Sequence, residues 1–311
     1  MATHFLDDSE PHAFWDRALA PRVVVEPGDT VVFRTREGTG QVTPESGSEQ
    51  LGRLRPELIH ALNGPVAVRG AEPGDVLVVD VVSLEHGGWG WNGVIPGFGL
   101  LAGDFTEPYI HHYELVGDRC FFDERIVIPY EPFCGTMGVA LDEDGRFDTA
   151  PPRRNGGNVD IRQLTAGSRL WLPVLHPGGL FSCGDCHAAQ GDGEVNGTGI
   201  ETPMTVTLRF DLEPAAGRAP LPELQFQTAA RPLTRADSAG YFVTTAHGPD
   251  LFANSQNAVR YMLDHLVSEH DVTREQAYCI TGAAVDLRIS EIVDEPNYIV
   301  SAFLPLSIFT Q

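Results

Sequence analysis

Glycine and proline divide this chain into short segments, and they limit its fold more than any other feature. The 311 residues include 33 glycines and 23 prolines, a content that favours turns and short strands over long helices. The tetrapeptide Glu-Pro-Gly-Asp occurs at 26–29 and again at 72–75, each time directly before a valine-rich run. Proline followed by glycine is typical of a type II turn, because glycine accepts the positive φ that this turn requires. We therefore predict strands at Thr30–Thr35 and Val76–Val82.

Helical periodicity is confined to the C-terminal part of the sequence. Apolar residues recur at helical spacing between 251 and 269, and Asp250 precedes them as an N-cap. A second helix is expected to begin near Thr273, which stands three residues before Gln276 in a capping-box arrangement. Further strands are expected at Tyr113–Val116, Ile126–Pro129, Leu170–Leu175 and Met204–Asp211. The pattern predicts an α+β protein that is predominantly β.

The length of the chain favours more than one hydrophobic core. We predict an N-terminal mostly-β domain at 1–150 and a central β part at 151–222, which carries the candidate site described below. A C-terminal α/β part is predicted at 223–311. The first boundary lies at a turn-rich Pro-Pro-Arg-Arg-Asn-Gly-Gly segment, and the second follows the Pro/Ala-rich segment 214–222.

Residues 178–201 combine glycines with groups that bind metals or carry protons. The groups are Asp185, His187, Asp192, Glu194 and Glu201. Five glycines between 178 and 193 argue against a helix, since glycine in a helix interior costs roughly 1 kcal/mol relative to alanine. Asp185 and His187 are two residues apart, so on an extended segment their side chains point to the same side. An acidic surface loop with one stray histidine is the plain alternative, but five such groups favour a divalent-metal hydrolytic site.

The charge of the chain excludes several classes of partner. It contains 43 acidic and 21 basic residues, a formal net charge of −22, which repels nucleic acid and anionic lipid. No apolar run approaches the roughly 20 residues that span a bilayer, and the acidic N-terminus does not resemble a signal peptide. Five cysteines, an odd number scattered along the chain, fit a reducing compartment. We therefore expect a cytoplasmic protein with neither nucleic-acid nor membrane partners.

The central stretch, GGLFSCGDCHAAQGDGEVNGTGIE, resembles the signature of the acetamidase/formamidase family. Other segments resemble the same family in the same order: IHALNGPVAVRGAEPGDVLVVDV from Ile59, IPGFG from Ile95, PFCGTMGVA from Pro132, PPRRNGGNVDIRQL from Pro151 and YCITGAAVDLRISEIVD from Tyr278. The resemblance covers nearly the whole chain. It implies a jelly-roll-like β-sandwich with a second small β-barrel-like part and a C-terminal α/β part.

The resemblance also implies site residues outside the central stretch. His60 matches a histidine that the family carries ahead of its Gly-Pro pair, so we expect it to bind the metal together with Asp185 and His187. We also expect Glu201 at the metal, where it and Asp192 would orient ligands or hold a second cation such as calcium. Asn158 lies in a matching block and could hold the substrate amide or support the metal ligands. Two aromatic residues of the Gly-rich stretch 87–99, Trp91 and Phe98, could line a substrate pocket or cover a core edge.

The residues that are absent limit the mechanism of amide hydrolysis. The sequence contains no lysine and no G-x-S-x-G elbow, which excludes Lys-dependent amidases and the α/β-hydrolase type. Cys183 and Cys186 have the spacing of half a zinc knuckle, but no second pair completes it. We interpret them as small buried residues, with a thiolate nucleophile as the alternative. Water activated by a metal therefore remains as the nucleophile for amide hydrolysis.

We therefore predict a hydrolase that splits formamide, acetamide or a similar small linear amide into carboxylate and ammonia. The metal, most consistent with zinc, would polarise the carbonyl and lower the pKa of a bound water. Glu194 would act as the base, with Asp192 as a further catalytic residue. Two alternatives stay open: a lactamase acting on a small cyclic amide, and a non-catalytic protein that binds a metal or a small molecule. We expect a homodimer.

Overall fold

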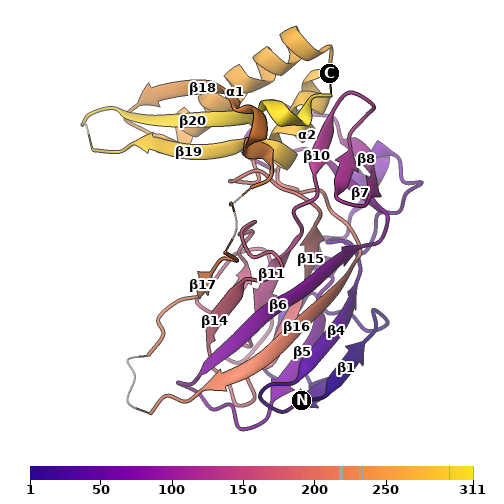
Figure 1. Cartoon of the computed structure of the whole chain (residues 1–311), viewed down its shortest axis with the longest axis vertical. Coiled ribbons are helices and arrows are strands. Elements are labelled where there is room, and N and C mark those ends of the chain that lie inside the picture. Colours follow the sequence, from indigo (N-terminus) through magenta and orange to yellow (C-terminus); the bar gives the residue numbers. More distant parts are fainter. Residues whose placement is uncertain (217–219, 231, 233, 294, 311) are drawn as a thin grey trace.

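The body of the protein is a β-sandwich, shown in the lower half of Figure 1. This computed structural model describes residues 1–216, 220–230, 232, 234–293 and 295–310. One sheet has six strands, in the order β1 (Thr3–Leu6), β4 (Thr30–Thr35), β16 (Met204–Glu213), β6 (Val76–His86), β14 (Arg169–Pro173) and β17 (Gln225–Gln227). The facing sheet has five, in the order β13 (Gly156–Asn158), β11 (Phe133–Gly138), β15 (Phe181–His187), β5 (Asn63–Val68) and β3 (Val23–Val25).

Alternation of apolar and polar residues explains why the two sheets pack face to face. Along β16 every second residue from Met204 to Phe210 is buried, which is the pattern of a strand with one face in a core. The rings of Phe33, Phe181 and Phe210 meet between the sheets, with centroids 5.1 to 6.4 Å apart. Because Phe181 begins β15, this aromatic contact anchors the strand that carries two of the candidate ligands.

A smaller β part and a C-terminal unit lie at one end of the sandwich (Figure 1). The small part is an antiparallel sheet in the order β10 (Val127–Pro129), β9 (Arg119–Phe121), β8 (Tyr109–Val116) and β7 (Trp89–Val94). The C-terminal unit contains the sheet β18 (Tyr241–Gly248), β20 (Tyr298–Pro305) and β19 (Asp286–Glu291), together with α1 (Leu251–His270) and α2 (Arg274–Ala284). Short elements complete the chain: the pair β2 (Phe14–Trp15) and β12 (Phe147–Asp148), and 3-10 turns at Ser48–Arg53, Pro56–Leu58, Ala236–Ala239 and Leu306–Ile308.

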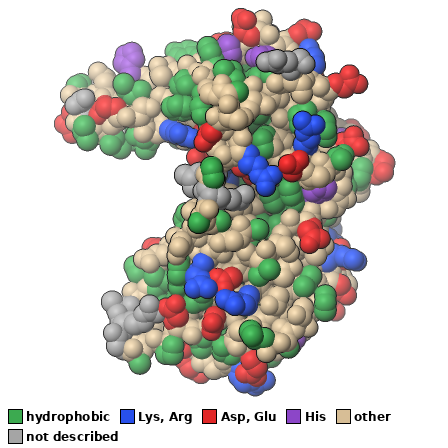
Figure 2. Space-filling model, in the orientation of Figure 1, with side chains coloured by type: hydrophobic (Ala, Val, Ile, Leu, Met, Phe, Trp, Pro, Cys, Tyr) green, Lys and Arg blue, Asp and Glu red, His purple; other side chains and the backbone are tan. Residues whose placement is uncertain are grey.

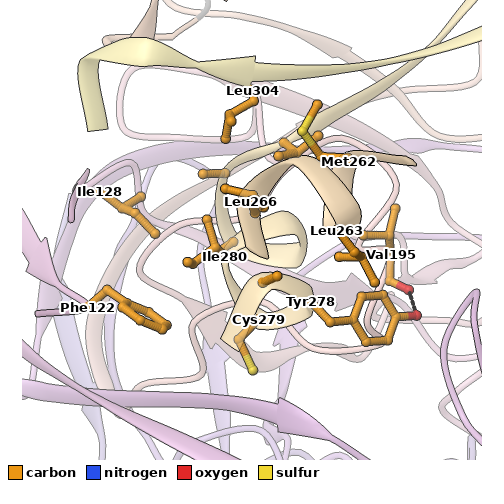
Figure 3. Close-up of a cluster of buried hydrophobic side chains, with 14 of the residues drawn as sticks. Phe122, Ile128, Val195, Met262, Leu263, Leu266, Tyr278, Cys279, Ile280 and Leu304 are labelled. Carbon is orange, nitrogen blue, oxygen red and sulfur yellow. Dashed lines mark hydrogen bonds between the residues drawn. The ribbon is translucent and has the colours of Figure 1, made fainter. Parts of the chain in front are cut away.

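The two helices form a second core with the small sheet (Figure 3). Met262 and Leu266 of α1 pack with Ile280 of α2. Ile128 of β10 and Phe122, which follows β9, belong to the same core. Both helices begin at the predicted caps. Asp250 accepts hydrogen bonds from two amides at the start of α1, and the capping box of Thr273 is complete.

The structure confirms the predominantly β α+β fold and most of its expected strands. Both Pro-Gly turns have a glycine at positive φ, Gly28 at 93° and Gly74 at 100°, directly ahead of β4 and β6. Part of the glycine-rich stretch 178–201 is a strand, since β15 lies in the middle of the five-stranded sheet. Likewise, part of the Gly-rich stretch 87–99 is strand β7, because its backbone pairs with β8.

The predicted division of the chain into three parts stays a prediction. Strands from both sides of residue 150 pair within the six-stranded sheet, for example β6 with β14 and β4 with β16. The Pro/Ala-rich segment 214–222, at the second predicted boundary, lies partly outside the described residues. In Figure 2 the C-terminal unit projects from the sandwich, so this face of the molecule is indented between them. Within the described part of the chain, no helix is long and apolar enough to cross a membrane.

Candidate metal centre

Strand β15 carries Asp185 and His187 to the end of the sandwich that faces the C-terminal unit (Figure 1). It is hydrogen-bonded on one side to β11, where Phe133 pairs with His187, and on the other to β5. As the spacing predicts, the two side chains meet: His187 Nε2 lies 3.6 Å from Asp185 Oδ1. Asp185 has a φ of 53°, which a non-glycine residue in a strand adopts only under constraint from its surroundings.

Glu201 reaches the same point from a segment that crosses β15. Its backbone pairs with Trp91, whose amide donates to the Glu201 carbonyl (2.9 Å) and whose carbonyl accepts from the Glu201 amide (2.7 Å). Its Oε1 lies 3.1 Å from His187 Nε2 and accepts a hydrogen bond from the amide of Gly199. The structure therefore brings Glu201 to the predicted centre.

His60 lies on the opposite side of Asp185. Its Nε2 is 3.6 Å from Asp185 Oδ2. Its Nδ1 is 3.2 Å from the hydroxyl of Thr149, which also accepts a hydrogen bond from the His60 amide. This contact turns Nε2 toward the carboxylate, and binding of a metal by His60 stays a prediction.

Asp160 and Glu194 complete the cluster. Ligand atoms of Asp160, Asp185 and His187 lie within 4.8 Å of one another, and so do those of His187, Glu194 and Glu201. Five non-glycine residues in the described chain have positive φ, and three of them are Asp160, Asp185 and Glu194. Because backbone strain of this kind gathers at functional sites, the presence of three such residues in one cluster is itself a sign of function.

The hydrogen bonds of His187 leave its Nε2 facing carboxylates. Nδ1 lies 2.7 Å from Oε1 of Gln190, whose orientation is fixed because its Nε2 donates to the Asp160 carbonyl. An amide oxygen can only accept, so Nδ1 carries a proton, and Nε2 is the ring position that faces the carboxylates. In the described part of the chain, three buried atoms here have no hydrogen-bond partner: His187 Nε2, Glu201 Oε2 and Asp160 Oδ1. Carboxylate oxygens left this way favour a positive charge between them. Burial lowers the pKa of His187, but the neighbouring Glu201 and Asp185 outweigh burial and raise this pKa well above its usual value. A proton on Nε2 or a metal ion in its place supplies that charge.

The pKa values express the same excess of negative charge. Burial, and then the neighbouring Asp185, raise the pKa of Glu201 to about 7, and the same causes raise that of Asp160 to about 7. Burial also raises the pKa of Glu194 well above its usual value. Burial opposes ionisation of Asp185, but the charges of His60 and His187 outweigh it and lower the pKa of Asp185. The cluster therefore favours binding of a cation.

Three glycines enclose the cluster without leaving room for side chains. A Cβ at Gly38 would lie 2.6 Å from Glu201 Oε2 and closer still to Asp185 Oδ1. At Gly135 it would lie 2.6 Å from Asp160 Oδ1, and at Gly199 it would strike the ring of His187. The donor set of imidazole nitrogens and carboxylate oxygens fits zinc or a similar divalent ion. The residues present thus fit a metal.

Gly38 is held in place by Glu37, and the sequence analysis missed both residues. Glu37 is buried and accepts from the indole N–H of Trp91 at 3.0 Å. It also accepts from the Thr39 hydroxyl and from the amide of Gln41, which fixes the turn around Gly38. The segment has no apolar periodicity, so no local signal distinguished it from an ordinary polar loop.

The three predicted substrate contacts have different surroundings. Trp91 is fully buried, and its contacts hold Glu37 and Glu201. Phe98 is 54% exposed. Asn158 accepts from the hydroxyl of Thr136, which also lies 3.3 Å from Asp185 Oδ2, so Asn158 is one residue removed from the cluster. Their contacts with substrate stay predictions.

Asp192 lies outside both groups of candidate ligands. Its Oδ1 accepts from Gln163 Nε2 at 2.9 Å and lies 3.5 Å from Arg162 Nε. Arg153 and Arg154, the arginines of the Pro-Pro-Arg-Arg segment, have their partners elsewhere. Arg154 binds Asp142, and Arg153 donates to backbone carbonyls. The catalytic role of Asp192 stays a prediction.

The cysteines belong to the hydrophobic cores. All five are free and buried, and Cys183 and Cys186 pack inside the sandwich. Cys186 Sγ lies 3.6 Å from Cys134 Sγ, and this contact and burial raise the pKa of Cys186 well above its usual value. A buried thiol with a raised pKa is a poor nucleophile, so the geometry does not favour the thiolate alternative.

Comparison with known proteins decides the family. Residues 3–144 and 142–311 match the Acetamidase/Formamidase family. The chain belongs to this family. A formamidase from Methylophilus methylotrophus is 28% identical over 97% of this chain and 90% of its own length. An acetamidase from Mycolicibacterium smegmatis is 29% identical over 65% of each chain.

Solved structures are similar to this chain over nearly its whole length. A gamma lactamase from Delftia acidovorans superposes with a TM-score of 0.90, at 24% identity, over all of this chain and 94% of its own. An acetamidase from Bacillus halodurans has a TM-score of 0.67 at 28% identity, over 97% of both chains. At 24% identity the likeness to the lactamase concerns the fold alone.

Proposed function

We propose that this protein hydrolyses a small linear amide, such as formamide or acetamide, to a carboxylate and ammonia. The observation that carries the proposal is the buried cluster in which His187 Nε2 faces the carboxylates of Asp185 and Glu201, enclosed by closely packed glycines. Membership of a family whose relatives are named formamidase and acetamidase supports the reaction class. A small neutral substrate also suits a chain of net charge −22.

Four side chains would hold the metal: His60, Asp185, His187 and Glu201. Asp160 is a fifth candidate, since its buried Oδ1 points into the same group. Zinc suits the mixture of imidazole and carboxylate, whereas calcium would use the oxygens alone. A divalent metal bound here would polarise the carbonyl and lower the pKa of water.

Glu194 is the candidate for proton transfer. It lies within the group that contains His187 and Glu201, and no hydrogen bond within the described chain ties its carboxylate down. We propose that it accepts a proton from the attacking water and delivers it to the leaving nitrogen. Water and amide are thereby converted to carboxylate and ammonia. Asn158, through Thr136, helps to orient Asp185.

Ammonia release from acetamide and formamide tests the proposal. The protein is first stripped of metal and then reloaded with zinc, and a γ-lactam is assayed in parallel. Turnover of a linear amide that depends on zinc supports the proposal, and preference for the lactam would assign the alternative substrate class. Zinc binding without turnover of either would show a non-catalytic binding protein.

A cytoplasmic location and a homodimer are further proposals. The five free cysteines suit a reducing compartment. Exposed apolar side chains on the C-terminal unit, among them Phe252, Ile289 and Val293, suit association of two copies. Sedimentation analysis at several concentrations tests the dimer.

A further inference from the structure

The loop that follows β15 is held from its far side by the C-terminal unit. The amide of Gly191 donates to the carbonyl of Gly282 at the end of α2 (2.8 Å), and the amide of Leu287 in β19 donates to the carbonyl of Asp192 (2.9 Å). The amide of Asp192 in turn donates to Asp286 Oδ1 at 3.1 Å. The loop that leads from His187 to Glu194 is therefore held by three hydrogen bonds at Gly191 and Asp192.

A second contact secures the end of this loop. In Figure 3 the hydroxyl of Tyr278, from α2, donates to the carbonyl of Val195, the residue after Glu194. The same hydroxyl accepts from the amide of Leu101 at 2.8 Å. Helix α2 thus contacts the loop beside the candidate base.

Arg162 joins the C-terminal unit to the interior of the loop. Its side chain is 9% exposed, and its Nη1 donates to Asp286 Oδ1 at 2.7 Å and to the carbonyl of Gln190 at 3.0 Å. Its Nε lies 3.5 Å from Asp192 Oδ1. A buried guanidinium that bridges two carboxylates and a carbonyl fixes their relative positions, because each of its donors has a set direction.

Gln190 connects Arg162 to the metal centre. Its side-chain oxygen accepts from His187 Nδ1, and its side-chain nitrogen donates to the backbone of Asp160. One residue therefore sets both the tautomer of His187 and the approach of Asp160. Its own backbone is the part that Arg162 holds.

We propose that Arg162 is a positioning residue for the metal centre, and that its ion pair with Asp286 makes the C-terminal unit part of that centre. The inference rests on the proposed metal-dependent function. Residues that orient metal ligands typically change metal affinity or activity 10- to 100-fold when removed. Arg162 acts through Gln190, so we expect a loss of roughly 10-fold, at the lower end of that range.

The test compares Arg162→Gln with Arg288→Gln. Arg288 also binds Asp286, through Oδ2 at 2.8 Å, but it is exposed and no contact links it to Gln190. Zinc affinity is measured by equilibrium dialysis, and the visible spectrum of the cobalt form reports ligand geometry. We expect Arg162→Gln to bind zinc roughly 10-fold more weakly with altered cobalt bands, and Arg288→Gln to match the wild type. Wild-type affinity and spectrum in a folded Arg162→Gln protein would overturn the proposal.

Two additions keep the test decisive. If Arg162→Gln does not fold, Arg162→Lys keeps the positive charge but loses the planar fork, in which Nη1 reaches Asp286 and Gln190 while Nε faces Asp192. A weaker zinc affinity in this variant supports the proposal, and unchanged affinity refutes it. The ¹⁵N resonances of the His187 ring provide a readout without metal. If the wild-type protein binds no metal, the proposed function fails. The positioning role of Arg162 is then still tested: loss of the protected Nδ1–H signal of His187 in the Arg162 variant alone would support that role, and retention of the signal would refute it.

Discussion

Replacing Gly38 with alanine tests whether the carboxylates stand where the structure places them. The added Cβ would lie 2.6 Å from Glu201 Oε2, whereas ordinary contact begins at 3.4 Å, so this carboxylate must retreat by about 0.8 Å. Asp185 Oδ1 is closer and must move further. The φ of Gly38 is not in the left-handed region, so alanine adds a steric conflict and little backbone strain.

A displacement near 1 Å of groups that position a reaction can cost about 100-fold in rate. We therefore expect kcat/KM for amide hydrolysis to fall by about that factor, together with weaker zinc binding. Ammonia-release kinetics and metal analysis measure both. Gly52→Ala is the control, because a Cβ there meets nothing within 4 Å. If Gly38→Ala kept wild-type zinc content and a kcat/KM within a factor of about two, the proposed arrangement of Asp185 and Glu201 would be refuted.

The remaining predictions distinguish metal ligands from the catalytic base and from residues that take no part in the reaction. Glu194→Gln should keep its metal while kcat falls by roughly 10² to 10⁴. Asp185→Asn and His187→Ala should lower both metal content and kcat. Loss of metal from Glu194→Gln would instead show that Glu194 is a ligand. Chelation should abolish activity and leave the far-UV circular dichroism native, since the folded cores do not include the centre, and unfolding on chelation would show a structural metal. Cys183→Ser should keep most turnover in the ammonia assay, although a hydroxyl in the core lowers the melting temperature; a drop of several orders of magnitude would favour a thiolate mechanism.

Local sequence signals predicted the elements whose causes are local. Pro-Gly turns preceded β4 and β6, and the caps Asp250 and Thr273 began both helices, because each depends on residues a few positions apart. Asp185 and His187 were predicted to meet for the same reason. His60 was found only through resemblance, since 125 residues separate it from Asp185.

The rest of the centre depends on contacts between distant segments. After His187 the chain leaves the strand, so alternation no longer tells which side chain turns inward, and Gln190 rather than Asp192 faces the ring. Gly38 shows no local pattern, and its role follows only from its approach to Asp185 and Glu201. No local pattern marks Arg162 either, because its partner, Asp286, lies 124 residues away.

Anomalous diffraction from crystals equilibrated with zinc tests the central claim most directly. Data collected on either side of the zinc absorption edge locate the ion without reference to activity. We expect a peak between His187 Nε2 and the carboxylates of Asp185 and Glu201, at the roughly 2.0 to 2.2 Å from nitrogen and oxygen ligands that zinc requires. A fully occupied peak elsewhere, or none beside His187, would contradict the account.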